Sequence, residues 1–179
     1  AKALDLPPYT IHASPIMLPE GGMIDLIEWV DPFDPAAPYA GVHHPGIAAI
    51  SLTTTNIDSD VEKLKAGGVA VISDPVTAPG DGASVRFVYF KDPDGTLLQL
   101  IQTGRAKKAN PDGMNITAIE HITINTTSLE QSLDFYKGLG CTVVRQYEDN
   151  GSAEYAAAFG MSAFKLKGAL LKLHKGPRI

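Results

Sequence analysis

The chain has 179 residues, of which 44% are hydrophobic and 20% are charged, and its 15 Lys and Arg against 20 Asp and Glu give a formal net charge of −5. This composition is typical of a folded protein of one domain or two small ones, and it argues against disorder and against nucleic acid as a partner. The single cysteine, Cys141, excludes a disulfide within the chain, and no apolar run approaches the roughly 18 to 20 residues of a membrane-spanning helix, so we expect a cytoplasmic protein with no membrane partner.

Residues 1–32 are predicted to form two strands, the second of which contains the apolar run from Met23 to Trp29. An ungapped shift of 155 aligns Ala1–Ile24 with Ala156–Ile179, and several aligned pairs are identical or keep their apolar character. The match indicates a repeated element, and the alternative is chance similarity between two amphipathic strands. A Pro-rich linker leads from these residues to the next segment.

The segment from 46 to 104 has the pattern of a complete βαβββ unit. Ser59 and Glu62 have the spacing of a capping box at the start of a short amphipathic helix, and Gly67 and Gly68 end that helix. A strong turn signal, Asp92-Pro93-Asp94-Gly95, separates the last two strands. The predicted elements are strands over Ile47–Thr53, Val69–Ile72, Val85–Phe90 and Leu97–Gln102 and a helix over Asp58–Ala66.

The segment from 115 to 179 repeats this pattern, because an ungapped shift of 72 aligns Ile47–Val71 with Ile119–Val143. Thr127 and Glu130 take the capping-box positions of its helix. The predicted elements are a strand over Ile119–Asn125, a helix over Leu129–Leu139, a strand over Thr142–Tyr147 and two further strands within Ala153–Leu173.

Three segments therefore divide the chain. We interpret residues 1–32 as the C-terminal strands of a first βαβββ module, residues 46–104 as a complete module, and residues 115–179 as the module of a second repeat that is truncated at its last strand. The chain is then either a piece of a longer tandem protein or a circularly shifted form. Because residues 1–32 lack a first strand and a helix, their strands have unpaired edges, and we expect a homo-oligomer or pairing of modules within the chain.

The chain resembles the vicinal oxygen chelate superfamily, which includes glyoxalase I, bleomycin and fosfomycin resistance proteins, and extradiol dioxygenases. The resemblance rests on the stretches EHITINTTSLEQSLDFYKGLGCTVV, GIAAISLTTTNIDSDVEKLKAGGV and FVYFKDPDGTLLQLIQ. It implies an α+β fold in which paired βαβββ modules form curved mixed sheets around a cleft. It also implies that a small-molecule substrate or ligand binds in the cleft and that, in typical members, a divalent metal lies there.

Three polar residues in apolar strands are the candidate metal ligands. An acid in such a strand, as Asp25 is, costs several kcal/mol if it is left unpaired, so it needs a partner. The resemblance places His121, Asp25 and Gln99 at ligand positions in the first and last strands of the modules, where imidazole nitrogen and carboxylate oxygen suit Zn, Ni, Fe or Mn. The position aligned with His121 holds Ala49, which cannot ligate a metal, and Gln99 is a neutral amide.

These residues leave three functions open. The protein is a metal-dependent lyase, isomerase or dioxygenase, or a metal-free protein that sequesters a small molecule, or a module that retains the fold alone. Asp25 and His121 favour the first function, whereas Ala49 favours the second. No catalytic residue is assigned and no cofactor other than the metal is expected. The remaining histidines are interpreted as structural or surface residues: His12, His43, His44 and His174.

Overall fold

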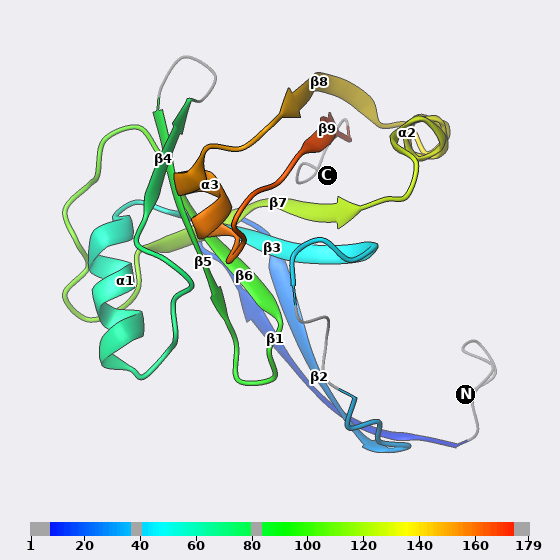
Figure 1. Ribbon diagram of the computed structural model, residues 1–179. Helices are drawn as coiled ribbons and strands as arrows, with labels where there is room; N and C mark the ends of the chain where they lie inside the picture. Colours follow the sequence, from blue (N-terminus) through cyan, green and yellow to red (C-terminus); the bar gives the residue numbers. More distant parts are fainter. Residues whose placement is uncertain (1–7, 37–40, 80–83, 174–179) are drawn as a thin grey trace.

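The computed structural model describes residues 8–36, 41–79 and 84–173 of the chain, and within these ranges it contains nine strands and three helices. The strands are β1 (Thr10–Met17), β2 (Met23–Asp31), β3 (Gly46–Thr54), β4 (Val76–Pro79), β5 (Ser84–Lys91), β6 (Leu97–Thr103), β7 (Ile116–Asn125), β8 (Thr142–Asp149) and β9 (Leu166–Lys172). The helices are α1 (Ile57–Ala66), α2 (Leu129–Gly138) and α3 (Ala153–Ala158). Figure 1 shows their arrangement.

A five-stranded mixed sheet with the order β4-β5-β6-β3-β7 forms the centre of the molecule (Figure 1). Strand β6 lies parallel to β3, whereas β7 lies antiparallel to β3 on its other side. The expected α+β class with a mixed sheet is confirmed. Strands β3 and β7 are also the two strands that the shift of 72 aligns, and they are neighbours in the sheet, from Gly46 opposite Asn125 to Thr54 opposite Ile116.

The two faces of this sheet carry different apolar clusters, because successive side chains along a strand point to opposite faces. One cluster packs beneath α1, which contributes its fully buried Ile57 and its buried Val61. The other cluster packs against α3 and the residue that follows it, Phe159. The buried members under α1 are Leu52, Ile57, Val61, Val88, Phe90 and Leu100, and those on the α3 side are Ala49, Val76, Phe87, Tyr89 and Ala158.

The two long helices begin within one residue of where the sequence predicted them, but their caps are different residues. Asn56 caps α1 by accepting the backbone N–H of Ser59 at 3.1 Å, and Ser128 caps α2 by accepting the backbone N–H of Gln131 at 3.4 Å. The capping boxes predicted from Ser59 and Thr127 are therefore wrong. An N-cap residue takes an extended conformation just before the first turn, and Ser59 already lies inside that turn.

Two predicted strands are also wrong. Residues Val69–Ile72 form a single bridge, from Val71 to Phe90, and the paired strand comes later, at Val76–Pro79. Residues Ala153–Ala158 form helix α3, because Ser152 caps them and Ala and Glu are strong helix formers. The described residues of the last segment therefore contain one strand after β8, whereas the sequence predicted two. The division of the chain into modules stays a prediction.

Two antiparallel hairpins lie outside the five-stranded sheet. Strands β1 and β2 form the first hairpin, with Thr10 near Asp31 and Met17 opposite Met23, and β8 and β9 form the second. The turn of the first hairpin is held to β7, because the backbone N–H of Glu20 donates to the carbonyl of Thr117 at 2.8 Å.

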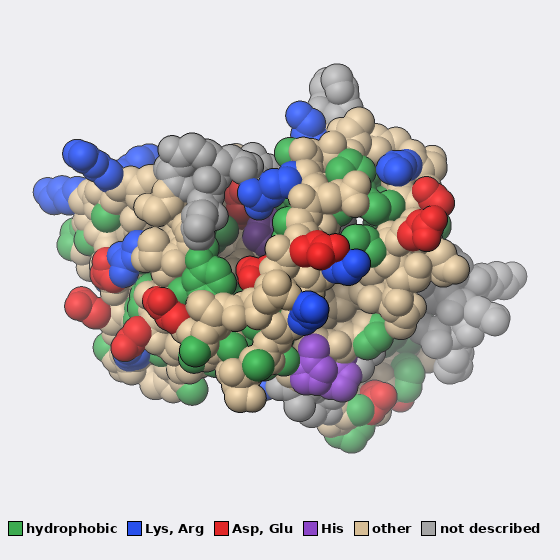
Figure 2. Space-filling view, turned by 45° about the horizontal axis from the view of Figure 1, so that its top comes forward, with side chains coloured by type: hydrophobic (Ala, Val, Ile, Leu, Met, Phe, Trp, Pro, Cys, Tyr) green, Lys and Arg blue, Asp and Glu red, His purple; other side chains and the backbone are tan. Residues whose placement is uncertain are grey.

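On the face of the molecule that Figure 2 shows, Lys and Arg side chains are interspersed with Asp and Glu side chains. Among the described residues, no helix has the length and apolar character needed to cross a membrane.

A buried carboxylate joins α1 to the start of β7. Asp60 is fully buried, and it accepts the hydroxyl of Thr54 at 2.5 Å and the backbone N–H and side-chain amide of Asn115 at 2.8 and 2.6 Å. These bonds tie together the end of β3, the helix and the first residue before β7. Asp60 thus helps to position the edge strand of the sheet.

We expect Asp60→Ala to lower the free energy of unfolding by about 3 kcal/mol, because it leaves three buried donors without an acceptor. The measurement is equilibrium unfolding in urea. The matched control is Asp58→Ala in the same helix, where the carboxylate pairs with Arg86 at 2.6 Å but is 59% exposed, and this change should cost under about 1 kcal/mol. Equal losses in the two variants would contradict the assigned role of Asp60.

Candidate functional site

Four polar side chains form a row across the sheet on the α3 side. Tyr89 of β5 lies opposite Gln99 of β6, Gln99 lies beside Ser51 of β3, and Ser51 lies opposite His121 of β7. The Ser51 hydroxyl donates to Gln99 Oε1 at 2.5 Å and lies 2.9 Å from His121 Nε2, and Gln99 also hydrogen-bonds with Tyr89. We call these four residues the polar row.

The polar row is largely closed to solvent. Ser51 is fully buried, Gln99 and Tyr89 are buried, and His121 is half-buried on the edge strand. Burial raises the pKa of the Tyr89 phenol well above its ordinary value, so this side chain stays neutral and keeps its proton. His121 is the member of the row that is most accessible from outside.

The hydrogen bonds assign the protons in the row. A hydroxyl has one proton, and the Ser51 hydroxyl donates it to Gln99. His121 therefore donates from Nε2 to the Ser51 oxygen, which requires the tautomer with a proton on Nε2. A serine nucleophile needs the reverse arrangement, in which the imidazole accepts the hydroxyl proton, and it must also reach its substrate. Ser51 and His121 are accordingly not a nucleophilic pair.

The structure brings together two of the three predicted metal ligands. Gln99 and His121 are joined through the single hydroxyl of Ser51, a residue that sequence reasoning did not select as a ligand or a bridge. Asp25 lies on β2 in a separate two-stranded sheet, and its side chain is exposed. The expectation that Asp25 is a buried acid in need of a partner is wrong, since β2 pairs only with β1 in the described part of the chain.

The donor set of the polar row does not fit a divalent metal. A catalytic metal usually takes three protein ligands, whereas this row offers His121 Nε2 and Gln99 Oε1, and both atoms are already bonded to Ser51. Within the described ranges, no three His, Cys, Asp or Glu side chains are placed so that they could hold a metal ion.

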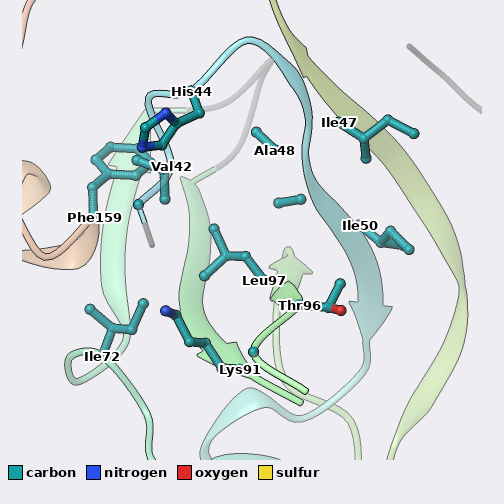
Figure 3. Close-up of a pocket in the computed structure, with 13 residues that line it drawn as sticks. Val42, His44, Ile47, Ala48, Ile50, Ile72, Lys91, Thr96, Leu97 and Phe159 are labelled. Atoms are coloured by element: carbon teal, nitrogen blue, oxygen red, sulfur yellow. The ribbon is translucent and has the colours of Figure 1, made fainter. Parts of the chain in front are cut away.

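A small pocket of about 110 Å³ lies beside the polar row, with Ala49 of β3 in its wall. Figure 3 shows Phe159 and Ile72 on one side of this pocket, Ala48 and Ile50 on the other, and Lys91 and Leu97 between them. Most of the lining is apolar, and the charged or titratable groups in it are Lys91 and His44. The lining residues are Gly41, Val42, His44, Ile47, Ala48, Ala49, Ile50, Ile72, Lys91, Gly95, Thr96, Leu97 and Phe159.

Sequence reasoning missed Lys91 and Thr96 as pocket residues. Both flank the Asp92-Pro93-Asp94-Gly95 turn, whose shape is set locally: the Asp92 side chain accepts the backbone N–H groups of Asp94 and Thr96 at 3.0 and 2.7 Å. The sequence predicted the turn correctly. It could not predict that Gly95 and Thr96 of the turn line a pocket, because Phe159 comes from a distant part of the chain.

The other histidines have separate surroundings. His12 is exposed on β1 and pairs with Glu28 of β2 at 2.8 Å, so it is neither a core nor a cleft-wall residue. The rings of His43 and His44 stack with centroids 5.0 Å apart, and the side chain of Asn125 donates to the carbonyl of His44 at 3.0 Å. His44 is half-buried and lines the pocket, whereas a surface position was expected. His174 lies outside the described residues.

We expect Ser51→Ala to lower the free energy of unfolding by about 2 kcal/mol, because it removes the hydroxyl that satisfies both Gln99 and His121. Urea unfolding measures the loss. The matched control is Ser84→Ala at the exposed start of β5, which should change stability by no more than about 0.5 kcal/mol. If the two variants were equally stable, the polar row would not be an ordered network.

Comparisons with known proteins agree with this architecture. A family model described as Glyoxalase/Bleomycin resistance protein/Dioxygenase superfamily matches residues 16–100. The chain is 28% identical over 120 residues to the lactoylglutathione lyase GLX1 of Arabidopsis thaliana, which covers 66% of this chain and 38% of that protein. It is 30% identical over 66 residues to the virulence protein STM3117 of Salmonella typhimurium, which covers 36% of this chain and 46% of that protein.

The fold is similar to a solved structure of a glyoxalase I mutant from Zea mays. The TM-score is 0.53 at 20% sequence identity, and the match covers 86% of this chain and 44% of that chain. At this identity the likeness concerns the fold alone. The chain spans less than half the length of the curated relatives it matches.

Proposed function

We propose, from the premise that this chain belongs to the Glyoxalase/Bleomycin resistance protein/Dioxygenase superfamily, that its pocket beside the polar row binds a small molecule without a divalent metal. The observation that carries this proposal is the Ser51 hydroxyl, which bonds to both candidate ligand atoms, Gln99 Oε1 and His121 Nε2. Ala49 supports it as well, because a methyl group occupies the wall where a second histidine would stand.

The pocket limits the size of its ligand. An apolar cavity of about 150 Å³ can hold benzene, so a cavity of about 110 Å³ suits the part of a ligand that has about four non-hydrogen atoms. Leu97, Ile72 and Phe159 offer apolar contacts to such a molecule. The ligand is therefore small and mainly hydrocarbon in the part that enters the pocket.

The charge of the lining residues limits the chemistry of the ligand. Lys91 carries an ammonium group, and Figure 3 shows its nitrogen near Leu97 and Ile72. The other titratable side chain among the described lining residues is His44. We infer that the pocket favours a small carboxylate over a neutral molecule of the same shape.

A second candidate function is metal-dependent catalysis, such as that named for the lactoylglutathione lyase relative. The observation that favours it is the meeting of Gln99 and His121 in one row, since both fall on ligand positions of the resembled family. Metal-dependent catalysis would need a further metal ligand and a rotation of the Ser51 side chain away from Gln99 Oε1 and His121 Nε2. In a longer protein that contains this chain, the presence of that further ligand would decide whether metal-dependent catalysis occurs.

We expect isobutyrate to bind at least tenfold more tightly than its neutral isostere isobutyramide, with chemical-shift changes in the amides of Ala49 and Leu97. Lys91→Met should reduce this preference to about twofold or less, because it removes the cation and keeps the length of the side chain. Lys65→Met is the control, since Lys65 is an exposed residue of α1 that pairs with Asp74, and it should leave the preference unchanged. Absence of localised shift changes would sink the binding proposal.

Zinc titration separates the two candidate functions. We expect Zn²⁺ to bind the unmodified chain no more than about threefold more tightly than it binds His121→Ala, measured by calorimetry at pH 7.5. A difference of tenfold or more would replace the metal-free proposal by the metal-dependent one.

A further inference from the structure

One wall of the pocket comes from a distant part of the chain. Among the described lining residues, all except Phe159 lie between Gly41 and Leu97, whereas Phe159 directly follows α3. Figure 3 shows the Phe159 ring on the side of the pocket across from Ala48 and Ile50. A change at Phe159 therefore alters the pocket without altering the strands of the sheet that form its other walls.

Contacts along α3 hold this helix against the sheet. The hydroxyl of Tyr155 donates to the backbone carbonyl of Thr77 in β4 at 3.2 Å, and Ala158 is fully buried in the cluster on the α3 side. The helix ends at Phe159, whose backbone N–H donates to the carbonyl of Tyr155 at 3.3 Å. Gly160 follows with a φ of +68°, in the left-handed region that favours glycine, so the chain turns away there. The end of the helix thus fixes the backbone of Phe159.

The Phe159 ring is also held by three aromatic rings that do not line the pocket. Its centroid lies 5.2 Å from that of Tyr89, 6.2 Å from that of Phe87 and 5.1 Å from that of Phe164. Phe164 itself packs directly on the backbone of Gly151, where an added Cβ would come within 2.6 Å of its ring. The Phe159 ring is therefore a fixed partition between the pocket and these aromatic side chains.

Loss of the Phe159 ring would enlarge the pocket in one direction. The ring has the size of benzene, and an apolar cavity of about 150 Å³ can hold benzene. A pocket of about 110 Å³ would thus gain room for one further aromatic ring. The new wall would consist of Phe87, Tyr89 and Phe164, against which a phenyl group packs favourably.

We propose that Phe159 determines the size selectivity of the pocket, in that its ring admits short aliphatic carboxylates and excludes carboxylates that carry an aromatic ring. This inference rests on the proposed function, because it assigns a selectivity to the carboxylate site that contains Lys91. With the carboxylate at Lys91, the apolar part of the ligand contacts Leu97 and Ile72 and is limited by the Phe159 ring. A phenyl group on the ligand would need the volume that this ring occupies, so the exclusion is steric.

Titration with isobutyrate and with phenylacetate, followed by the amide chemical shifts of Ala49 and Leu97, tests the selectivity. We expect the unmodified chain to bind isobutyrate at least about fivefold more tightly than phenylacetate, and Phe159→Ala to reverse this preference to at least about fivefold in favour of phenylacetate. Phe159→Leu keeps a branched apolar side chain in the cluster and serves if the alanine variant does not fold. It should reduce the preference for isobutyrate to about twofold or less.

The matched control is Phe135→Ala. Phe135 lies on α2, is 62% exposed and does not line the pocket, so the preference for isobutyrate should stay unchanged. A reversal in this variant as well would show that loss of a phenyl ring anywhere in the chain changes phenylacetate binding, and it would overturn the role assigned to Phe159.

The outcomes separate this inference from the proposed function. An unchanged preference in both Phe159 variants overturns the inference, and so does phenylacetate binding to the unmodified chain as tightly as isobutyrate. In both cases isobutyrate that still shifts the amides of Ala49 and Leu97 would support the proposed function. If neither carboxylate shifts these amides in the unmodified chain, the proposed function fails and the selectivity of Phe159 fails with it.

Discussion

The antiparallel pairing of β3 with β7 is the constraint on which the rest of the structure depends. It places two strands with aligned sequences side by side, so that Ser51 of one meets His121 of the other. The polar row exists only because these strands are in this register, since a slip of one residue would turn one of the two side chains to the opposite face. The buried Asp60 supports the pairing from below by holding Asn115, the residue that leads into β7.

In the polar row, hydrogen bonds within the protein compete with ligand binding for the same polar atoms. Buried polar groups need partners, and the Ser51 hydroxyl satisfies Gln99 on one side and His121 on the other. A family fold therefore does not by itself supply the family's chemistry, because a neighbouring hydroxyl and a missing histidine change what the site can bind.

Several apolar residues of the β1–β2 hairpin are exposed, and Leu129 of α2 is only half-buried. Each element has the composition of a covered element and lies next to an edge that remains open in the described chain. In the segment that contains β3, α1, β5 and β6, the aligned positions are buried.

Local patterns were sufficient to predict much of the fold. The helices at α1 and α2, the strands β3, β5, β6 and β7, and the Asp92 turn follow from alternation, helical periodicity and turn chemistry over short windows. Local patterns also misled where two interpretations compete. The run of residues in α3 is compatible with a strand by repeat alignment and with a helix by its alanines, and the cap at Ser152 decides in favour of the helix.

The sequence by itself determined the α+β class, the family resemblance and the selection of Gln99 and His121 as polar residues in apolar strands. Only the tertiary structure decided that Ser51 lies between them, that Asp25 is exposed, and that Lys91 and Phe159 share a pocket. The physical reason is the separation along the chain of the residues that interact. Secondary structure follows from contacts over a few residues, whereas burial and hydrogen-bond partners depend on strands that are 48 to 70 residues apart in the chain.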